Sequence, residues 1–264
     1  MSSVRSQDGT AIAFEWRGAG KPVILVDGAL CYRASGPSGP LAELLSKRFT
    51  VFTYDRRGRG GSGDASRYDV GREVEDLEAL LREAGGSASV FGVSSGAALA
   101  LEAANRRLHI EKLALYEAPF IVDESRPPLP DDFLPQLDGM LASGRRGDAV
   151  RLFMKAVGVP RIFVALMRLL PSWSKLEAIA HTLAYDMRIV EENQRGRPLP
   201  RGRWSSVEAP TLVVDGGKSP AWMRNAMREL AGVVPGAQHR TLPGQTHMVK
   251  PKVLAPVLGE FFAG

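Results

Sequence analysis

Residues 92–96 read Gly-Val-Ser-Ser-Gly, a G-x-S-x-G pattern between an apolar run at 88–93 and an Ala-rich stretch with helical spacing at 95–107. A strand-to-helix corner of this kind exposes the hydroxyl of its central serine, and the flanking glycines leave room for the sharp turn. Ser95 would open the helix, so free backbone amides and the positive end of the helix dipole would face a reacting carbonyl. Ser94 is therefore the candidate nucleophile, and the amide of Ser95 is a candidate oxyanion donor.

Apolar runs and helical stretches alternate along most of the chain. Five short runs rich in Val, Leu, Ile and Phe fall at residues 23–26, 49–54, 88–93, 113–116 and 211–214. Segments with helical spacing, such as 70–84 and 95–107, separate the first four, which is typical of a parallel sheet covered on both faces. We also expect an antiparallel strand at 10–16, a last strand at 240–242 and a closing helix at 251–262.

This alternation stops after Pro119 and resumes at Thr211. The segment between them is first rich in proline and then helical, with helices expected at 149–156, 161–170 and 176–188. An insertion between two sheet strands lies over their C-terminal ends, where open α/β sheets bind ligands. We therefore divide the chain into a core, residues 1–120 and 205–264, and a helical cap, residues 121–204.

The helix expected at 161–170 has a strongly apolar face. The face is formed by six side chains, those of Ile162, Phe163, Leu166, Met167, Leu169 and Leu170. Such a face lines a hydrophobic pocket or packs against other helices of the cap, and the sequence leaves both possibilities open.

The composition is that of an ordinary globular protein. With 264 residues, 44% of them hydrophobic and 24% charged, the chain is long enough for one α/β domain with an insertion. The polar start and the lack of a long uninterrupted apolar segment argue against secretion and against a membrane span. Cys31 is the sole cysteine, which excludes an internal disulfide and is compatible with a cytoplasmic location. We expect it to be a buried, unreactive thiol.

A formal net charge of +5 comes mostly from arginine, with a local concentration at Arg195, Arg197, Arg201 and Arg203. Aromatic residues do not interleave with these arginines, so we expect a solvated linker rather than a nucleic-acid-binding surface. No His, Asp and Glu cluster has the spacing of metal ligands, and we expect no metal and no cofactor. The sequence does not decide the oligomeric state.

Further features resemble those of the α/β-hydrolase superfamily, and the resemblance extends over nearly the whole chain. Residues 55–63, Asp-Arg-Arg-Gly-Arg-Gly-Gly-Ser-Gly, are similar to the family's D-x-R-G-x-G-x-S loop, and His247 lies in a Gly-containing loop near the C-terminus. The resemblance implies an α/β-hydrolase fold, with a mostly parallel central sheet flanked by helices and a helical cap inserted after the sixth strand. It also implies that His247 is the general base for Ser94.

The acid of such a triad departs from the common family pattern. Many members carry Asp in the turn that here reads Gly216-Gly217-Lys218-Ser219-Pro220, so Ser219 occupies the place of the acid. Two carboxylates can replace it. Glu117, at the end of the strand expected at 113–116, resembles the acid of a subset of haloalkane dehalogenases, whereas Asp215 is nearer the usual position but about one turn too early. We expect Glu117, with Asp215 as the alternative and a Ser-His dyad if neither reaches His247.

The resemblance also places an oxyanion loop and a pocket. Val26-Asp27-Gly28-Ala29 occupies the position of the family's His-Gly-x loop, which implies that the backbone amide of Ala29 is the second oxyanion donor beside Ser95. Asp27 in place of His is another departure from the family. Adjacency to these motif positions makes Leu30, Trp222 and Met248 candidate contacts in the substrate pocket.

Together these features imply a serine hydrolase that cleaves an ester, lactone or thioester of a small, largely apolar molecule through an acyl-enzyme. The changes at Asp27 and Ser219 leave two alternatives: a lyase, cyclase or acyltransferase of the same fold, or a ligand-binding protein with an idle triad. A dinucleotide-binding enzyme is disfavoured. Residues 58–63 formally fit G-x-G-x-x-G, but no helix is expected to begin within them.

Overall fold

The structure, a computed structural model, describes residues 2–65 and 67–264. Within these residues the chain forms eight strands, which are β1 (Ser2–Arg5), β2 (Ala11–Arg17), β3 (Pro22–Val26), β4 (Thr50–Tyr54), β5 (Ala88–Val93), β6 (Ile110–Tyr116), β7 (Thr211–Gly216) and β8 (Gln238–Leu242). The same residues form ten α-helices, which are α1 (Ser38–Leu45), α2 (Val70–Glu83), α3 (Ser95–Asn105), α4 (Phe133–Ala142), α5 (Arg146–Ala156), α6 (Arg161–Met167), α7 (Ser172–Ala178), α8 (Leu183–Val190), α9 (Ala221–Val233) and α10 (Pro251–Ala263). Two short 3-10 helices, η1 (Ala180–Thr182) and η2 (Glu191–Asn193), flank α8.

The strands form one sheet in the order β1-β2-β4-β3-β5-β6-β7-β8. β2 pairs antiparallel with β1 and with β4, and the remaining neighbours pair in parallel. β3 has β4 on one side and β5 on the other, so the direction of winding reverses between β3 and β5. The loops after these two strands, which begin at Asp27 and Ser94, therefore meet at the crevice where sheets of this kind bind ligands.

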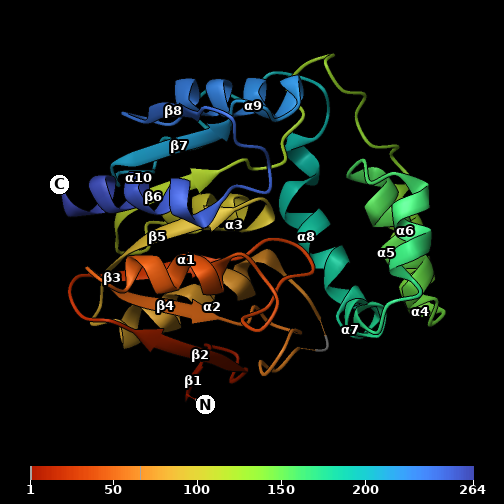
Figure 1. Cartoon of the computed structure of the whole chain (residues 1–264), viewed down its shortest axis with the longest axis horizontal. Helices are drawn as coiled ribbons and strands as arrows, with labels where there is room; N and C mark the ends of the chain where they lie inside the picture. Colours follow the sequence, from red (N-terminus) through yellow and green to blue (C-terminus); the bar gives the residue numbers. More distant parts are fainter. Residues whose placement is uncertain (1, 66) are drawn as a thin grey trace.

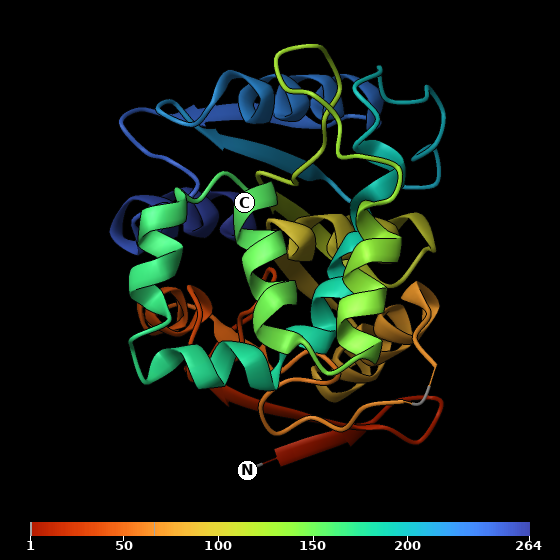
Figure 2. The same ribbon diagram turned by 90° about the vertical axis from the view of Figure 1, so that its right-hand side faces the viewer.

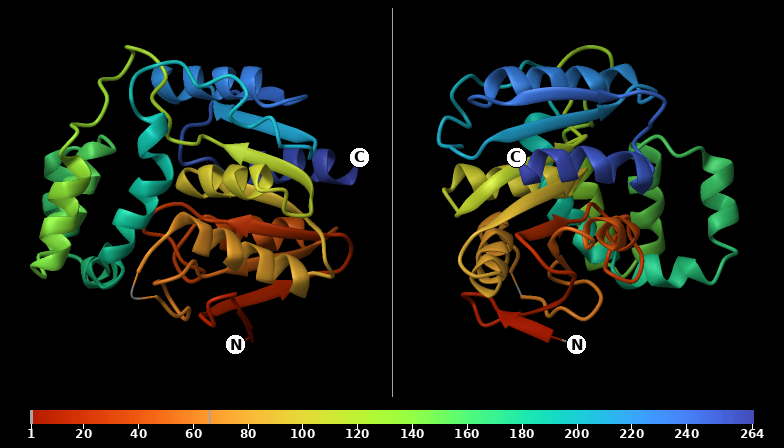
Figure 3. Two further views of the ribbon diagram at one scale, coloured as in Figure 1. Left: turned by 180° about the vertical axis from the view of Figure 1, so that it is seen from behind. Right: turned by 60° about the vertical axis from the view of Figure 1, so that its left-hand side comes forward.

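Helices cover both faces of the sheet because its central strands are apolar on both sides. On β7, for example, Leu212 and Val214 belong to the core layer under α1 and α10, whereas Val213 belongs to the layer under α2, α3 and α9. Figure 1 and Figure 3 show the sheet between these two sets of helices. The expected α/β-hydrolase fold, with its mostly parallel sheet and an insertion after the sixth strand, is confirmed.

The inserted segment leaves and rejoins the core through a narrow neck. The Ile121 amide donates to the Asn193 carbonyl, and the Gly196 amide donates to the Ile121 carbonyl, both at 2.8 Å. α8 packs directly on α3. Figure 1 shows α8 between the sheet and helices α4–α7, and Figure 2 shows the helices of the insertion in front of the sheet. The helix expected at 176–188 is interrupted: α7 ends at Ala178, and η1 precedes α8.

α6 exposes most of its apolar side chains. Val164 is buried, but Ile162, Phe163, Leu166, Leu169 and Leu170 at and just after this helix are all more than half exposed, with Leu169 at 80%. The sequence left open whether these side chains line a pocket or pack against other helices of the insertion. The five exposed side chains do not pack in that way. None of the described helices is long and apolar enough to cross a membrane.

Candidate active site

Ser94 occupies the corner between β5 and α3. Its backbone angles are φ 57° and ψ −128°, a conformation that residues other than glycine rarely adopt. The amide of Ser94 donates to the Tyr116 carbonyl on β6 at 2.9 Å, which attaches the corner to the neighbouring strand. The pattern G-x-S-x-G thus forms the strained strand-to-helix turn that is expected of a nucleophile elbow.

Glycines make this corner possible because backbone atoms pass close to them. A Cβ atom on Gly96 would collide with the Val26 carbonyl and lie 2.6 Å from the Asp27 carbonyl oxygen. A Cβ atom on Gly92 would lie 2.6 Å from the Ala97 Cα atom. Gly28, in the loop after β3, faces the nucleophile itself, since its Cβ would lie 2.9 Å from the Ser94 Cβ and 3.5 Å from the Ser94 Oγ. The loop after β3 therefore lies directly beside the Ser94 side chain.

His247 lies on the loop between β8 and α10, and several hydrogen bonds hold this loop in place. The Tyr116 hydroxyl donates to the Thr246 carbonyl at 2.7 Å. The Lys218 amide donates to the Gln245 carbonyl at 2.8 Å, and the Gln245 side chain accepts from the Lys250 amide at 3.1 Å. The loop that carries the imidazole is therefore attached both to β6 and to the turn after β7.

Glu117 is the carboxylate that contacts His247. Its Oε2 lies 2.8 Å from His247 Nδ1, and its Oε1 accepts a hydrogen bond from the Gly216 amide at 2.7 Å. Glu117 is fully buried and has a positive φ of 46° just after β6, with its amide donating to the Val214 carbonyl at 3.2 Å. Both carboxylate oxygens thus have partners, and one of them fixes the orientation of the imidazole.

Asp215 has a different partner. It is fully buried, and its Oδ2 lies 2.6 Å from His239 Nε2 on β8. Ser219, in the position where many relatives carry the acid, is buried with no hydrogen-bond partner for its hydroxyl among the residues described. Of the two candidate acids, Glu117 therefore lies within hydrogen-bond distance of His247, whereas Asp215 pairs with another histidine.

The two candidate oxyanion donors lie on the loops that meet at the crevice. Ser95 is the first residue of α3, and Ala29 follows Gly28 in the loop after β3. Neither backbone amide donates to any atom of the described residues. Leu30, which follows Ala29, has a positive φ of 58°, so this loop turns sharply immediately after the candidate donor. Both amides are therefore available to a ligand.

Asp27 is buried beneath this loop. Its Oδ1 accepts a hydrogen bond from the Ser38 hydroxyl at 2.7 Å. Burial raises the pKa of Asp27 to about 6, although the hydrogen bond from Ser38 and the positive charge of Arg59 both act to lower it. The carboxylate that replaces the family's histidine is thus an internal group bonded to a neighbouring loop residue.

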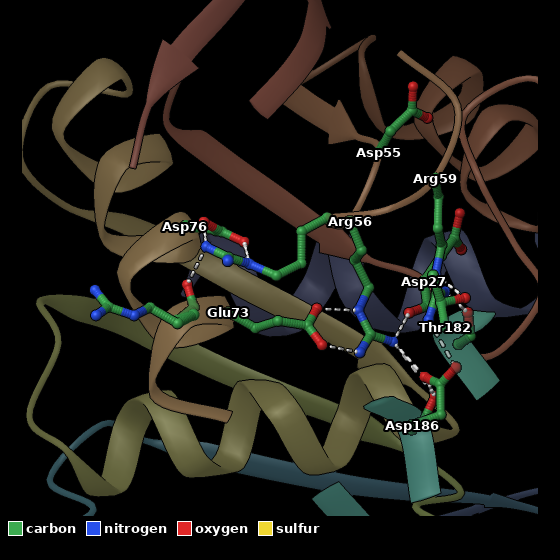
Figure 4. A network of polar contacts seen from close by, with 12 residues as sticks. Asp27, Asp55, Arg56, Arg59, Glu73, Asp76, Thr182 and Asp186 are labelled. Atoms are coloured by element: carbon green, nitrogen blue, oxygen red, sulfur yellow. Dashed lines mark hydrogen bonds and ion pairs between the residues drawn. The ribbon is translucent and has the colours of Figure 1, made fainter. Parts of the chain in front are cut away.

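A buried ionic network lies between the elbow and the inserted segment, and sequence reasoning did not find it (Figure 4). Arg56 pairs with Glu73 and Asp186, and Arg59 pairs with Asp186, each at 2.7 Å. Asp186 also accepts a hydrogen bond from the Ser95 hydroxyl at 2.7 Å. Two arginines directly after a buried strand indicate that carboxylate partners are needed, but nothing local identifies Asp186, which lies 130 residues from Arg56.

The three candidate pocket residues lie in different surroundings. Leu30 is buried in the hydrophobic core, whereas Met248, next to His247, is 82% exposed. Trp222, at the start of α9, packs under the Arg126 guanidinium at 4.2 Å. No contact within the described residues brings these three side chains together. Cys31 is half-buried rather than fully buried as expected, and burial raises its thiol pKa to about 12, which leaves it unreactive.

Among the described residues no group of three or more His, Cys, Asp or Glu side chains could hold a metal ion. Of the four arginines expected in a solvated linker, Arg195, Arg197 and Arg201 are exposed; Arg195 pairs with Asp131 and Arg203 with Glu192.

Comparison with known proteins identifies the family of the chain. A sequence model described as the alpha/beta hydrolase family matches residues 9–256. The chain belongs to the alpha/beta hydrolase family. A comparison with curated proteins gave no match.

Among solved structures, the chain is similar to an alpha/beta hydrolase from Sphaerobacter thermophilus DSM 20745, with 53% identity, a TM-score of 0.90 and coverage of 99% of this chain and 100% of that chain. It shares its fold with a hydrolase from Pseudomonas aeruginosa PA01 at 21% identity and a TM-score of 0.75, covering 100% and 98% of the two chains. An enol-lactonase from Burkholderia xenovorans LB400 matches at 20% identity and a TM-score of 0.70, covering both chains completely. The family and the 53% identical neighbour support hydrolase activity, whereas the other two neighbours show a shared fold.

Proposed function

We propose that the chain is a serine hydrolase in which Ser94 attacks a carbonyl carbon, His247 carries the proton and Glu117 orients His247. The observation that carries this proposal is the 2.8 Å contact between His247 Nδ1 and Glu117 Oε2. A buried carboxylate beside Nδ1 favours the tautomer with its proton on that atom, which leaves Nε2 free to accept the proton of the serine. The strained backbone of Ser94 at the end of β5 supports its role as the nucleophile.

The reaction proceeds through an acyl-enzyme. Ser94 Oγ bonds to the carbonyl carbon while His247 takes the hydroxyl proton, and the amides of Ala29 and Ser95 stabilise the oxyanion that forms. The bond to the leaving group then breaks, and the leaving oxygen or sulfur takes the proton from His247. Water attacks the acyl-enzyme by the same route, which releases the acid and restores Ser94.

The substrate that we propose is an ester, lactone or thioester of a small, largely apolar molecule. The exposed apolar side chains at α6 and the exposed Met248 beside His247 support an apolar acyl or alcohol group. The enol-lactonase from Burkholderia xenovorans LB400 shares only the fold, but it makes lactones a natural early member of a substrate panel. We also propose that the protein acts in the cytoplasm without a cofactor.

The proposal is tested by labelling the intact protein with a fluorophosphonate and measuring its mass. We expect a single covalent adduct that is lost in Ser94→Ala and retained in Ser219→Ala, a control that removes a buried serine hydroxyl in the turn after β7. Hydrolysis is then measured on a panel of acyl esters, lactones and thioesters. Absence of an adduct on the wild-type protein would favour a ligand-binding protein with an idle triad.

Product analysis separates the remaining alternative. A serine hydrolase releases the free acid with one equivalent of alcohol or thiol. A lyase, cyclase or acyltransferase of the same fold would label at Ser94 yet give an eliminated, cyclised or transferred product instead. If such products form without the free acid, the protein is assigned a lyase, cyclase or acyltransferase reaction in place of hydrolysis.

A further inference from the structure

Both segments that carry the proposed oxyanion donors are connected to one carboxylate of the inserted segment. Asp186 lies on α8, is almost completely buried and accepts a hydrogen bond from the Ser95 hydroxyl at 2.7 Å. The same carboxylate pairs with Arg56 and Arg59, each at 2.7 Å. Ser95 follows the nucleophile directly, and the two arginines come from the loop after β4 (Figure 4).

The arginines extend this connection to the loop after β3. Arg59 Nη1 donates to the Gly28 carbonyl at 2.7 Å, and Arg56 Nη1 donates to the Asp27 carbonyl at 3.3 Å. In a planar trans peptide unit the C=O and the following N–H point in opposite directions. A guanidinium that holds the Gly28 carbonyl therefore fixes the direction of the Ala29 amide, which points to the opposite side of the peptide plane.

Burial makes these contacts depend on one another. Two positive charges, on Arg56 and Arg59, are balanced by two negative charges, on Glu73 and Asp186, and all four side chains are buried. Burial alone would raise the pKa of Asp186, but the charges of Arg59 and Arg56 hold it below its usual value, so the carboxylate stays ionised. A buried charge that loses its partner is costly, so no member of the network moves independently.

We propose that Asp186 is a positioning residue, which from the inserted segment fixes both oxyanion-stabilising amides through the Ser95 hydroxyl and through Arg59. The role rests on the proposed function, since these amides act only if Ser94 attacks a carbonyl. On this proposal α8 helps to hold the active site in position, and it does not move as a lid.

The test compares Asp186→Asn and Ser95→Ala with Asp138→Asn. Asp138, on α4, pairs at 2.7 Å with Arg188 of α8, the helix that carries Asp186. Its side chain is 42% exposed and lies outside the network, which makes it a matched control. Steady-state kinetics are measured on an ester that the wild-type enzyme hydrolyses, together with the affinity for a boronic acid that forms a tetrahedral adduct on serine. Rates are expressed per active site, as titrated with a fluorophosphonate.

We expect kcat and boronic acid affinity to fall together, about 100-fold in Asp186→Asn and about 10-fold in Ser95→Ala, with KM within about threefold of wild type. Asp138→Asn keeps the wild-type kcat. A purely structural role would lower the unfolding temperature and the number of active sites but not kcat per site. Unchanged kcat in both folded variants would therefore overturn the proposal.

A second pair of variants decides the question if Asp186→Asn does not fold. Ser95→Ala removes one hydroxyl, and Arg59→Lys keeps the positive charge but loses the planar guanidinium that reaches both Asp186 and the Gly28 carbonyl. Wild-type kcat in these two variants would overturn the role of the network. A wild-type protein that does not acylate at Ser94 would instead overturn the proposed function itself, so the two failures are distinguishable.

Discussion

At the scale of single residues, two buried carboxylates each lie beside a histidine, and only one of the histidines follows the last strand in the loop that faces the elbow side of the sheet. Glu117 contacts His247 at 2.8 Å and Asp215 contacts His239 at 2.6 Å. The two pairs are close in chemistry, burial and position at the ends of neighbouring strands. Substitution of each carboxylate by its amide therefore compares the proposed catalytic acid, Glu117, with a matched buried carboxylate, Asp215.

We expect Glu117→Gln to lower kcat by about 10³–10⁴-fold and Asp215→Asn to change it by less than about fivefold. The Gly216 amide donates to Glu117 Oε1, so a Gln would keep its carbonyl oxygen at that position and present its NH2 group to His247 Nδ1. The imidazole proton would then move to Nε2, and the base would lose its free lone pair. The measurement is kcat on the best ester of the panel at pH 8. The opposite ranking of the two variants would assign the role of the acid to Asp215.

Asp27 gives a prediction on stability. Burial raises its pKa to about 6 from 3.8, against the lowering effects of Ser38 and Arg59. The folded state therefore holds the proton more tightly than the unfolded state, and stability falls as pH rises through about 4 to 6. The difference between the pKa of Asp27 in the folded and unfolded states corresponds to a loss of about 3 kcal/mol in the free energy of unfolding, and this loss is complete above about pH 7. Asp27→Asn should recover much of it at neutral pH, because an Asn Oδ1 still accepts from Ser38.

The check is urea unfolding at pH 4 and at pH 7.5. The gain of Asp27→Asn over wild type should be small at pH 4 and large at pH 7.5. Asp123 provides a control of opposite sign, since the hydrogen bond from Ser125 lowers its pKa and Asp123→Asn should lose stability at neutral pH. A variant of Asp27 that is no more stable than wild type at pH 7.5 would show that the carboxylate is stabilised by its surroundings.

The residues that could be predicted from the sequence lie in local patterns. Ser94 stands in a five-residue motif and His247 in a turn after the last strand, and Glu117 follows directly from the end of a strand. Asp186 has no such pattern, because it is selected by two arginines that the fold brings to it from more than 120 residues away. The residues next to it in the sequence, Tyr185 and Met187, are typical of an ordinary helix and do not indicate a functional carboxylate.

At the scale of secondary structure, strands with apolar runs were predicted close to their observed bounds because burial on both faces dictates their composition. β1 (Ser2–Arg5) was missed since it is an exposed edge strand, specified by its pairing with β2 rather than by its own residues. α9 was also missed, although Met223, Ala226, Met227 and Leu230 show helical spacing. α4 has Pro135 and Gly139 in its interior, which weakens its helical pattern.

The junction of β5 and α3 depends on glycine, which leads to a prediction on this pair of elements. Gly96→Ala should destabilise the fold by about 1–3 kcal/mol, because its Cβ would collide with the backbone of β3, which β4 and β5 hold on both sides. It should also abolish labelling of Ser94. Gly139→Ala on the exposed side of α4 is the control, since its Cβ meets no atom within 4 Å and should stabilise by up to about 1 kcal/mol. Thermal unfolding and labelling measure both effects; a Gly96→Ala variant with wild-type labelling would contradict the close approach of α3 and β3.

At the scale of the whole molecule, the reversal of strand order between β3 and β5 sets where the chemistry lies. The loops after these strands carry Ala29 and Ser94, two residues of the proposed active site, and the insertion after β6 returns α8 to α3 beside them. The position of the insertion was predicted from the break in the alternation of apolar runs, whereas the order of strands within the sheet was not. The inward placement of α8 was not predicted either, because it depends on packing against α3 and on ionic contacts with the loop after β4, both far away in the sequence.

The apolar side chains at α6 and the exposed Met248 are placed on the C-terminal side of the sheet by the topology, α6 from the insertion and Met248 from the loop after β8. We expect Leu166→Gln and Met248→Gln to raise KM several-fold for esters with long acyl chains and to leave KM for acetyl esters unchanged. Stability should change by less than about 0.5 kcal/mol, because both side chains are already exposed. Val164→Ala, a buried position in the same helix, should instead cost about 1.5 kcal/mol. Kinetics across an acyl-chain series and urea unfolding check these values; an unchanged KM with the long-chain esters would place the apolar side chains outside the path of the substrate.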